Sequence, residues 1–224
     1  MGSRKTFNLD KNRDRFQPIT WKELVTRFEP KFHKPFSKAQ DQLTEIVVFS
    51  ADAKGKVRIE GDLVIDCRRA NVVVDGDLVI DGNLVMSVDE GFGNFVLVTG
   101  DVTANAICLT GFPELAVRGD VTCTSGIIGI RGDDGGFFDV SGNVKAPVIV
   151  ADTYFNFKFA GTVAGVTINT SHRAWKARYT EENVGKVVLA KYLEGDDDDE
   201  EGEVMLDSEA VFAAIRAGRS ILRP

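Results

Sequence analysis

Apolar and polar positions alternate through the middle of the chain around a recurring glycine. The repeated phrase is apolar-x-apolar-x-Gly-[Asp/Asn/Thr]-[Leu/Val]-x-(apolar or small). Its six copies span 57–65, 72–80, 96–104, 115–123, 138–146 and 157–165, and a shorter copy starts at Gly82. Alternation with a period of two residues is typical of a half-buried β-strand. A strand-length unit that returns about every 19 residues predicts a solenoid of stacked turns.

Each copy predicts a strand, a corner and a second strand. The glycine bends sharply or adopts positive φ, and the following Asp or Asn bonds to neighbouring backbone. A second apolar pair often follows and predicts a further side of the coil: Ile107 and Leu109, Ile128 and Ile130, Val148 and Val150, Val166 and Ile168. We expect seven apolar side chains to point inward and stack in register: Leu63, Ile65, Leu78, Ile80, Val102, Val121 and Val144.

The ends of the chain break this pattern, which predicts three zones. Residues 1–45 are expected to form an N-terminal cap, residues 46–170 a single-stranded parallel β-helix, and residues 171–224 a C-terminal cap. Capping is expected because an exposed first or last turn invites edge-to-edge pairing. The fold class is therefore an all-β solenoid with short helical caps at both ends.

Two short helices are predicted in these end zones. Thr20 and Glu23 have the spacing of a capping box, which predicts a helix to about Phe28. A second helix is predicted over 209–217, ended by Gly218. Its N-cap is Asp207 or Ser208, and three residues form the face expected to dock on the coil: Val211, Phe212 and Ile215.

Composition agrees with a turn-rich β protein that does not enter a membrane. The 224 residues include 22 glycines and 6 prolines. An apolar run of about 18 residues, the minimum for a membrane-spanning helix, is absent from the sequence. The N-terminus lacks the apolar stretch of a signal peptide. The three cysteines, at 67, 108 and 123, lack metal-ligand spacing, and free thiols without a secretion signal predict a cytoplasmic location.

Aspartates follow four of the repeat glycines and are expected to stack along one corner: Asp62, Asp77, Asp101 and Asp120. Such a row either binds Ca²⁺ or acts on a polysaccharide, or its side chains cap turns. Later copies place Asn143 and Thr162 there, which keep hydrogen bonds but lose charge. This drift favours turn capping.

Residues typical of catalysis are scarce in the coil. The 2 histidines, His33 and His172, lie outside the repeat, and neither Cys67 nor Cys108 has a recognisable activating neighbour. The glycines at 91 and 93 lack the third glycine of a dinucleotide loop. We therefore expect no catalytic, cofactor or metal site, and no enzyme activity.

The phrases at 76–84, 98–104 and 117–122, which read GDLVIDGNL, VTGDVTA and VRGDVT, resemble the bactofilin-like "polymer-forming cytoskeletal" β-helix proteins. The resemblance covers roughly residues 57–168. The whole chain resembles a subgroup with extra terminal segments, which is similar to immunity proteins of bacterial polymorphic toxins. The resemblance implies a right-handed β-helix and a protein-binding role, and the added caps disfavour filaments.

Charge supplies the candidate binding site. The formal net charge is −7, although residues 1–45 are basic. An acidic run made of Asp196, Asp197, Asp198, Asp199, Glu200 and Glu201 is expected to steer a basic partner and to repel nucleic acid, or else to serve solubility. Four further candidate residues lie where the repeat is interrupted or side chains turn outward: Arg131, Asp133 and Asp134 in the interruption, and Tyr154.

Three functions follow from these observations. The first is an immunity protein that neutralises a cognate, basic bacterial toxin by direct binding. The second is a structural scaffold that self-assembles through its β-helix, and the third is a carbohydrate-active β-helix enzyme. Capped ends favour the first over the second and predict a monomer or small oligomer. The absence of a signal peptide disfavours the third.

Overall fold

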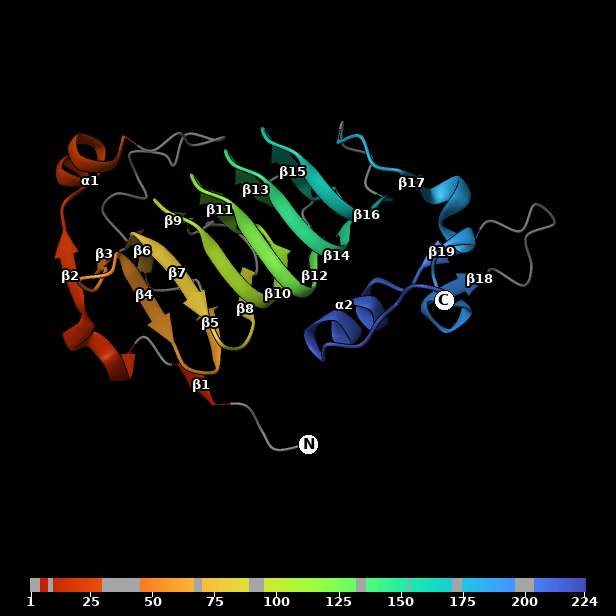
Figure 1. The fold of residues 1–224 in the computed structure, drawn as a ribbon, viewed down its shortest axis with the longest axis horizontal. Coiled ribbons are helices and arrows are strands. Elements are labelled where there is room, and N and C mark those ends of the chain that lie inside the picture. Colours follow the sequence, from red (N-terminus) through yellow and green to blue (C-terminus); the bar gives the residue numbers. More distant parts are fainter. Residues whose placement is uncertain are drawn as a thin grey trace.

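The chain winds into a β-solenoid made mostly of parallel β-sheet, as predicted (Figure 1). The computed structural model describes residues 5–7, 10–29, 45–66, 70–88, 95–131, 136–152, 154–170, 175–195 and 204–224. Successive turns of the coil stack along the long axis of the molecule, from β3 and β4 near one end to β15 and β16 near the other.

A ten-stranded sheet forms two of the three sides of the coil. The first side consists of β4 (Lys56–Ile59), β7 (Asp77–Ile80) and the first halves of four long strands, β10 (Val102–Gly111), β12 (Val121–Ile130), β14 (Val144–Ala151) and β16 (Val163–Asn169). The second side consists of the second halves of those strands together with β1 (Thr6–Phe7), β5 (Asp62–Asp66), β8 (Leu84–Val88) and β17 (Tyr179–Thr180). Register shifts within the long strands mark the corner between the two sides.

A seven-stranded sheet forms the third side. In spatial order its strands are β15 (Asn156–Phe159), β13 (Phe137–Val140), β11 (Glu114–Val117), β9 (Phe95–Val98), β6 (Ala70–Asp75), β3 (Glu45–Ser50) and β2 (Phe16–Ile19). All neighbours are parallel except β2, which pairs antiparallel with β3. The N-terminal edge of this side is therefore covered by a strand of reversed direction.

The seven side chains predicted to point inward are all buried in the central core. Their predicted single register is wrong. Leu78 pairs with Val102 on the first side, whereas Leu63 pairs with Leu84 on the second side. The phrases around Gly61 and Gly76 belong to different corners that use the same glycine-aspartate chemistry, so the sequence makes them look equivalent.

The second side is apolar on both faces. Ile107 and Leu109 point inward, but Ile128 and Ile130 join an outer apolar cluster, because Ile107 pairs with Ile127 and not with Ile128. The predicted apolar pairs thus lie on the expected side of the coil but on opposite faces of it. Strands covered on both faces carry continuous apolar runs, which hide the period of two.

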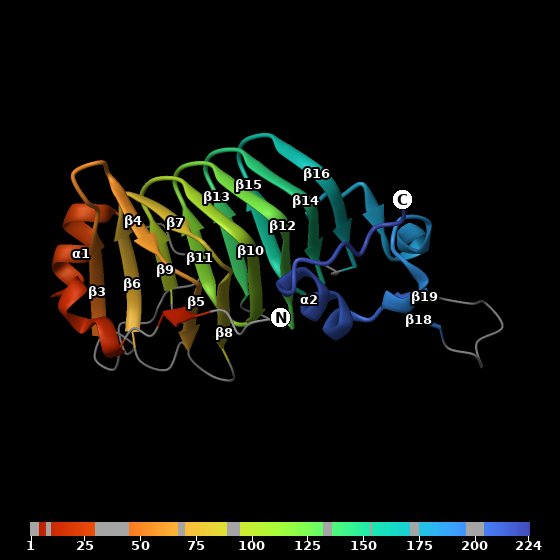
Figure 2. The same ribbon diagram turned by 60° about the horizontal axis from the view of Figure 1, so that its bottom comes forward.

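Residues after the coil cover this outer face. They form two 3₁₀ helices (Glu181–Lys186 and Ala190–Tyr192), an antiparallel hairpin of β18 (Leu193–Gly195) and β19 (Val204–Leu206), and helix α2 (Ser208–Arg216). Val211 and Ile215 of α2 are fully buried against the coil, and Phe212 is partly buried there, as predicted. Figure 2 shows α2 alongside the coil, with β17 to β19 beyond the last turn.

Both predicted helices begin as expected. Helix α1 (Trp21–Phe28) has a capping box in which Thr20 Oγ1 accepts from the Glu23 N–H at 3.2 Å and Glu23 Oε2 accepts from the Thr20 N–H at 2.7 Å. In α2 the N-cap is Asp207, whose Oδ1 accepts from the Ala210 N–H at 2.9 Å. Helix α1 packs with Leu24 and Phe28 on the outer face of the third side, over β3, β6 and β9.

Candidate protein-binding surface

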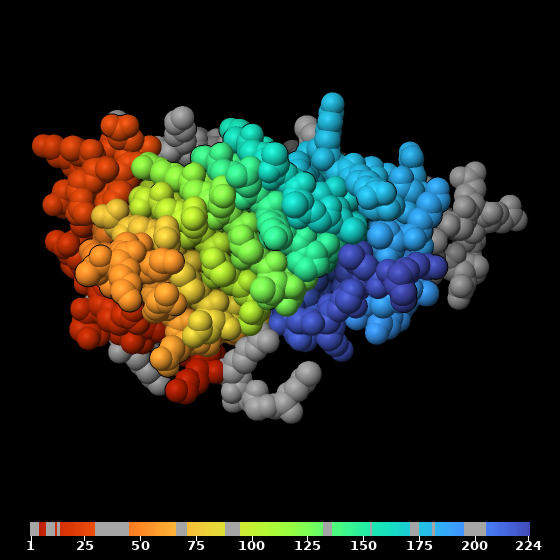
Figure 3. Space-filling model, in the orientation of Figure 1, coloured from red at the N-terminus to blue at the C-terminus, as the bar shows by residue number. Residues whose placement is uncertain are grey.

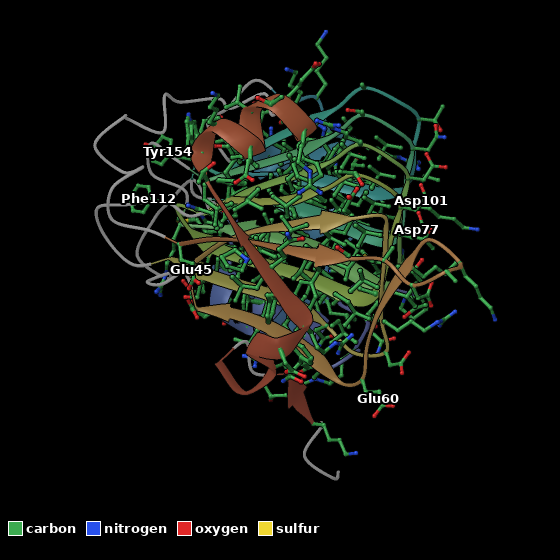
Figure 4. The ribbon with its side chains drawn as sticks, turned by 90° about the vertical axis from the view of Figure 1, so that its left-hand side faces the viewer. Glu45, Glu60, Asp77, Asp101, Phe112 and Tyr154 are labelled. Atoms are coloured by element: carbon green, nitrogen blue, oxygen red, sulfur yellow. The ribbon has the colours of Figure 1, made fainter. Side chains whose placement is uncertain are left out.

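Side chains at the corner between the third and first sides link successive turns of the coil. The Oδ1 atoms of Asp77, Asp101 and Asp120 each accept a hydrogen bond from the N–H of the equivalent residue one turn later, at 3.0, 2.8 and 2.7 Å. Asn143 continues the series, since its Oδ1 accepts from the Thr162 N–H at 3.0 Å. We call these five residues the corner ladder. Figure 4 shows Asp77 and Asp101 side by side at this corner.

Asp62 was expected in this row but lies at a different corner. Its Oδ1 accepts from the Asn83 N–H at 2.9 Å, where the first and second sides meet. The same Gly-Asp phrase therefore serves two corners, because both need an acceptor that bridges consecutive turns.

Glycine precedes each ladder residue for reasons of space. A Cβ at Gly119 would lie 2.2 Å from Asp101 Oδ1 and 2.6 Å from the Gly100 carbonyl carbon. Gly100 and Gly142 are similarly crowded by Asp77 and Asp120. Positive φ, which the sequence suggested for these glycines, is found in this series only at Gly76.

In each ladder aspartate, Oδ1 is thus engaged in a hydrogen bond that links two turns, which agrees with the turn-capping interpretation. Among the described residues, no group of three or more His, Cys, Asp or Glu is arranged to hold a metal ion. The described cysteines are buried, and desolvation raises the pKa of the Cys108 thiol to about 12 and that of Cys123 well above its ordinary value. Both thiols are therefore protonated and inert at neutral pH.

The corner between the second and third sides carries Tyr154 and Phe112, opposite the ladder (Figure 4). Tyr154 has a φ of 62° and its side chain is 41% exposed. The Asn156 side-chain amide fixes this turn by donating to the carbonyls of Tyr154 and Gly136, at 3.2 and 3.1 Å. The neighbouring Phe155 is fully buried, so Tyr154 stands on an anchored turn and faces outward, as predicted.

The start of α2 is bonded to this same corner. Arg131, whose φ is 56°, forms an ion pair of 2.5 Å with Glu209. The largely buried carboxylate of Asp152 accepts hydrogen bonds from the hydroxyls of Ser208 and Thr170. Two candidates named from the sequence, Arg131 and Tyr154, are thus brought to the corner where α2 begins.

The acidic run occupies the connection between β18 and β19. Residues 196–201 lie outside the described residues, and so do Asp133 and Asp134. The strands that flank the run, β18 and β19, pair in antiparallel orientation, and Leu206 anchors the hairpin in the outer apolar cluster. Glu194 and Met205 form a pair on the exposed face, where Met205 is 55% exposed.

The coil also holds the other end of α2, through a contact that the sequence does not predict. The Asn83 side-chain amide, buried in the coil, donates to the Arg216 carbonyl at 2.9 Å. Asn83 replaces aspartate in the shortened copy after Gly82, and this departure from the repeat was its only sequence signal. Figure 3 shows α2 packed directly against the coil.

We define the acidic-hairpin surface as β18, β19, the first turn of α2, Arg131 and Tyr154. Comparison of the chain with protein-family models, with curated proteins and with solved structures gives no match. No helix among the described residues is long and apolar enough to cross a lipid bilayer.

Proposed function

We propose that this chain is a non-enzymatic protein-binding module that neutralises a cognate bacterial toxin by binding it directly. The partner is a basic protein, and the acidic-hairpin surface is its docking site. The resemblance of the whole chain to the subgroup of bactofilin-like proteins that is similar to immunity proteins is consistent with this role.

The placement of the acidic run is the observation that carries the proposal. Six consecutive acidic residues, at 196–201, are inserted between two paired strands at the end of an elongated molecule. A concentrated negative charge between two paired strands attracts a basic partner and raises its association rate. A loop kept only for solubility needs no such anchoring.

The anchoring of α2 supports the same proposal. Coil side chains hold α2 at both ends, through Asp152 with Ser208 and through Asn83 with the Arg216 carbonyl. The hairpin precedes α2 directly, so it is presented from a fixed base. A surface positioned before binding loses less conformational entropy when the partner arrives.

The other two functions receive less support. A self-assembling scaffold needs free edges at both ends, but β2 and β1 pair along N-terminal edges of the coil. A carbohydrate-active enzyme needs paired carboxylates available for acid-base chemistry. The ladder aspartates instead bond to backbone in successive turns.

The first test is protection of a host cell. A candidate toxin, the product of a gene adjacent to the one that encodes this chain, is expressed with and without this chain, and lysates are examined for a co-purifying complex. We expect restored growth and a stable complex of the two proteins. Continued growth arrest at matched expression, with no complex between the purified proteins, would refute it.

A further inference from the structure

Three residues other than glycine adopt a left-handed backbone in the part of the chain that the structure describes. They are Glu29, Arg131 and Tyr154, with φ of 42°, 56° and 62°. The remaining described residues with positive φ are glycines, because a side chain disfavours this conformation, most strongly when it is bulky. Each exception therefore needs a reason in its side chain or in its local surroundings.

Two of the exceptions have a local reason. Glu29 is the C-cap of α1, a position at which helices commonly end in this conformation. Arg131 pairs its guanidinium with Glu209 in the first turn of α2, and this contact joins the coil to that helix. Tyr154 is neither a helix cap nor part of this ion pair, so its conformation needs another explanation.

The turn around Tyr154 is fixed by contacts that would remain with glycine in its place. The Phe155 N–H donates to the Asp152 carbonyl at 3.2 Å, and the Asn156 side-chain amide donates to the Tyr154 carbonyl at 3.2 Å. The fully buried ring of Phe155 packs directly against Gly136. None of these contacts uses the tyrosine side chain, so on their own they would favour glycine at this position.

The tyrosine is large and well exposed at the candidate surface. Its exposed fraction is 41%, at the corner between the second and third sides (Figure 4). The carboxylate of Asp152, two residues earlier, accepts from the Ser208 hydroxyl at the start of α2, which ties this turn to the helix. Tyrosine is among the residue types that dominate binding energy at protein interfaces. A bulky side chain kept exposed at a strained position indicates a role in binding.

We propose that Tyr154 is the anchor that holds the partner protein once the two have met. The inference rests on the proposed function and states what the partner presents: a recess lined by apolar side chains, with a hydrogen-bonding group for the phenol hydroxyl. The anchored turn sets the direction of the ring before binding, and the ring has only two side-chain torsions to fix, so little conformational entropy is lost. Tyr154 therefore controls the dissociation rate of the complex.

Dissociation of the complex with the purified candidate toxin, measured by surface plasmon resonance, tests the proposal. Tyr154→Gly should dissociate about 30-fold faster or more, which is the loss expected of an interface hot spot. It should melt no lower than the wild type, because glycine adopts positive φ without strain. Tyr154→Phe keeps the ring and should dissociate at an intermediate rate. Glu29→Gly makes the same backbone change at the end of α1 and should leave the dissociation rate unchanged.

The outcomes distinguish this inference from the function on which it rests. A wild type that does not bind the candidate toxin refutes the proposed function, and the anchor role with it. A wild type that binds, together with a Tyr154→Gly variant that dissociates equally slowly, refutes the anchor role alone. A Tyr154→Gly variant that melts far below the wild type would show that the tyrosine supports the fold, which also overturns the anchor role.

Discussion

Asp101 Oδ1 accepts a hydrogen bond of 2.8 Å from the backbone N–H of Asp120, one turn further along the coil. The same oxygen would lie 2.2 Å from a Cβ at Gly119, so the aspartate of one turn fits only beside the glycine of the next. The repeated Gly-Asp phrase is therefore an interlock between turns. It fixes the stacking register of the coil and thereby the position of every surface built on it.

The interlock predicts different effects for two substitutions at Asp120. Asp120→Ala removes the acceptor for the Asn143 N–H and should lower the free energy of unfolding by about 1 kcal/mol. Asp120→Asn keeps an acceptor oxygen and should unfold close to the wild type, as Asn143 already performs this role for Thr162. Urea unfolding compares the two variants. An equal loss of unfolding free energy in both variants would mean that charge, and not the hydrogen bond, matters at this corner.

Gly119→Ala tests the steric half of the interlock. The added Cβ would meet Asp101 Oδ1 and the Gly100 backbone, and backbone cannot move aside cheaply. We expect a loss of about 2–3 kcal/mol in unfolding free energy, as for overpacking of a tight site. Thr103→Ala, on the exposed face of β10, is the control and should change stability little. A Gly119→Ala variant as stable as this control would show that space is not the reason for glycine.

Leu78→Asp tests the inward orientation of the first side. Leu78 is 1% exposed in the central core, so the carboxylate would be buried without a partner and should cost several kcal/mol. Thr103→Asp introduces the same group at an exposed position one residue beyond Val102, with which Leu78 pairs. The melting temperature of Leu78→Asp should lie far below that of Thr103→Asp. Similar melting temperatures would contradict the assigned core.

Thiol labelling tests whether α2 covers the second side. Cys108 lies in the outer apolar cluster with Ile215, and burial raises its pKa to about 12, so it should label very slowly at pH 8. Ile215→Asp should release α2, restore an ordinary thiol pKa and make Cys108 reactive. Ala213→Asp, on the exposed face of α2, should not. Both variants are made in a Cys67→Ser background, because Cys67 lies outside the described residues.

An unchanged labelling rate in Ile215→Asp would mean that another segment shields Cys108. The reactive cysteine is identified by mass spectrometry of the labelled peptides. Labelling of Cys123 as well would indicate that the coil itself had opened, because Cys123 lies in the central core.

The solenoid was predictable because its chemistry is local and repeated. Alternating apolar residues and Gly-Asp corners specify strands and turns wherever they occur, and Thr20 with Glu23 specifies the start of α1 in the same way. The register was not predictable. Gly61 and Gly76 look alike, yet they belong to different corners, since a corner is defined by contacts between turns and not by the phrase itself.

The exposure of individual residues of the candidate surface was predictable, but their proximity in space was not. Exposure of Tyr154 followed from alternation with Phe155 and Phe157. The ion pair between Arg131 and Glu209, and the contact of Asp152 with Ser208, join residues more than fifty positions apart. No sequence pattern marks such a contact. The contact of Asn83 with α2 was equally unpredictable, because a single asparagine in an irregular repeat does not indicate one particular partner.

The association rate of the cognate toxin, measured by stopped flow at low and high salt, tests whether the acidic run attracts the toxin. Changing Asp196, Asp197, Asp198 and Asp199 to Asn should slow association at low salt and affect dissociation little, because charges at the rim of an interface act mainly on encounter. A control removes four exposed carboxylates elsewhere: Asp14→Asn, Glu29→Gln, Glu60→Gln and Asp81→Asn. We expect a slower association rate for the first variant than for the control, with the difference vanishing at high salt. Equal rates for both variants at low salt would contradict it.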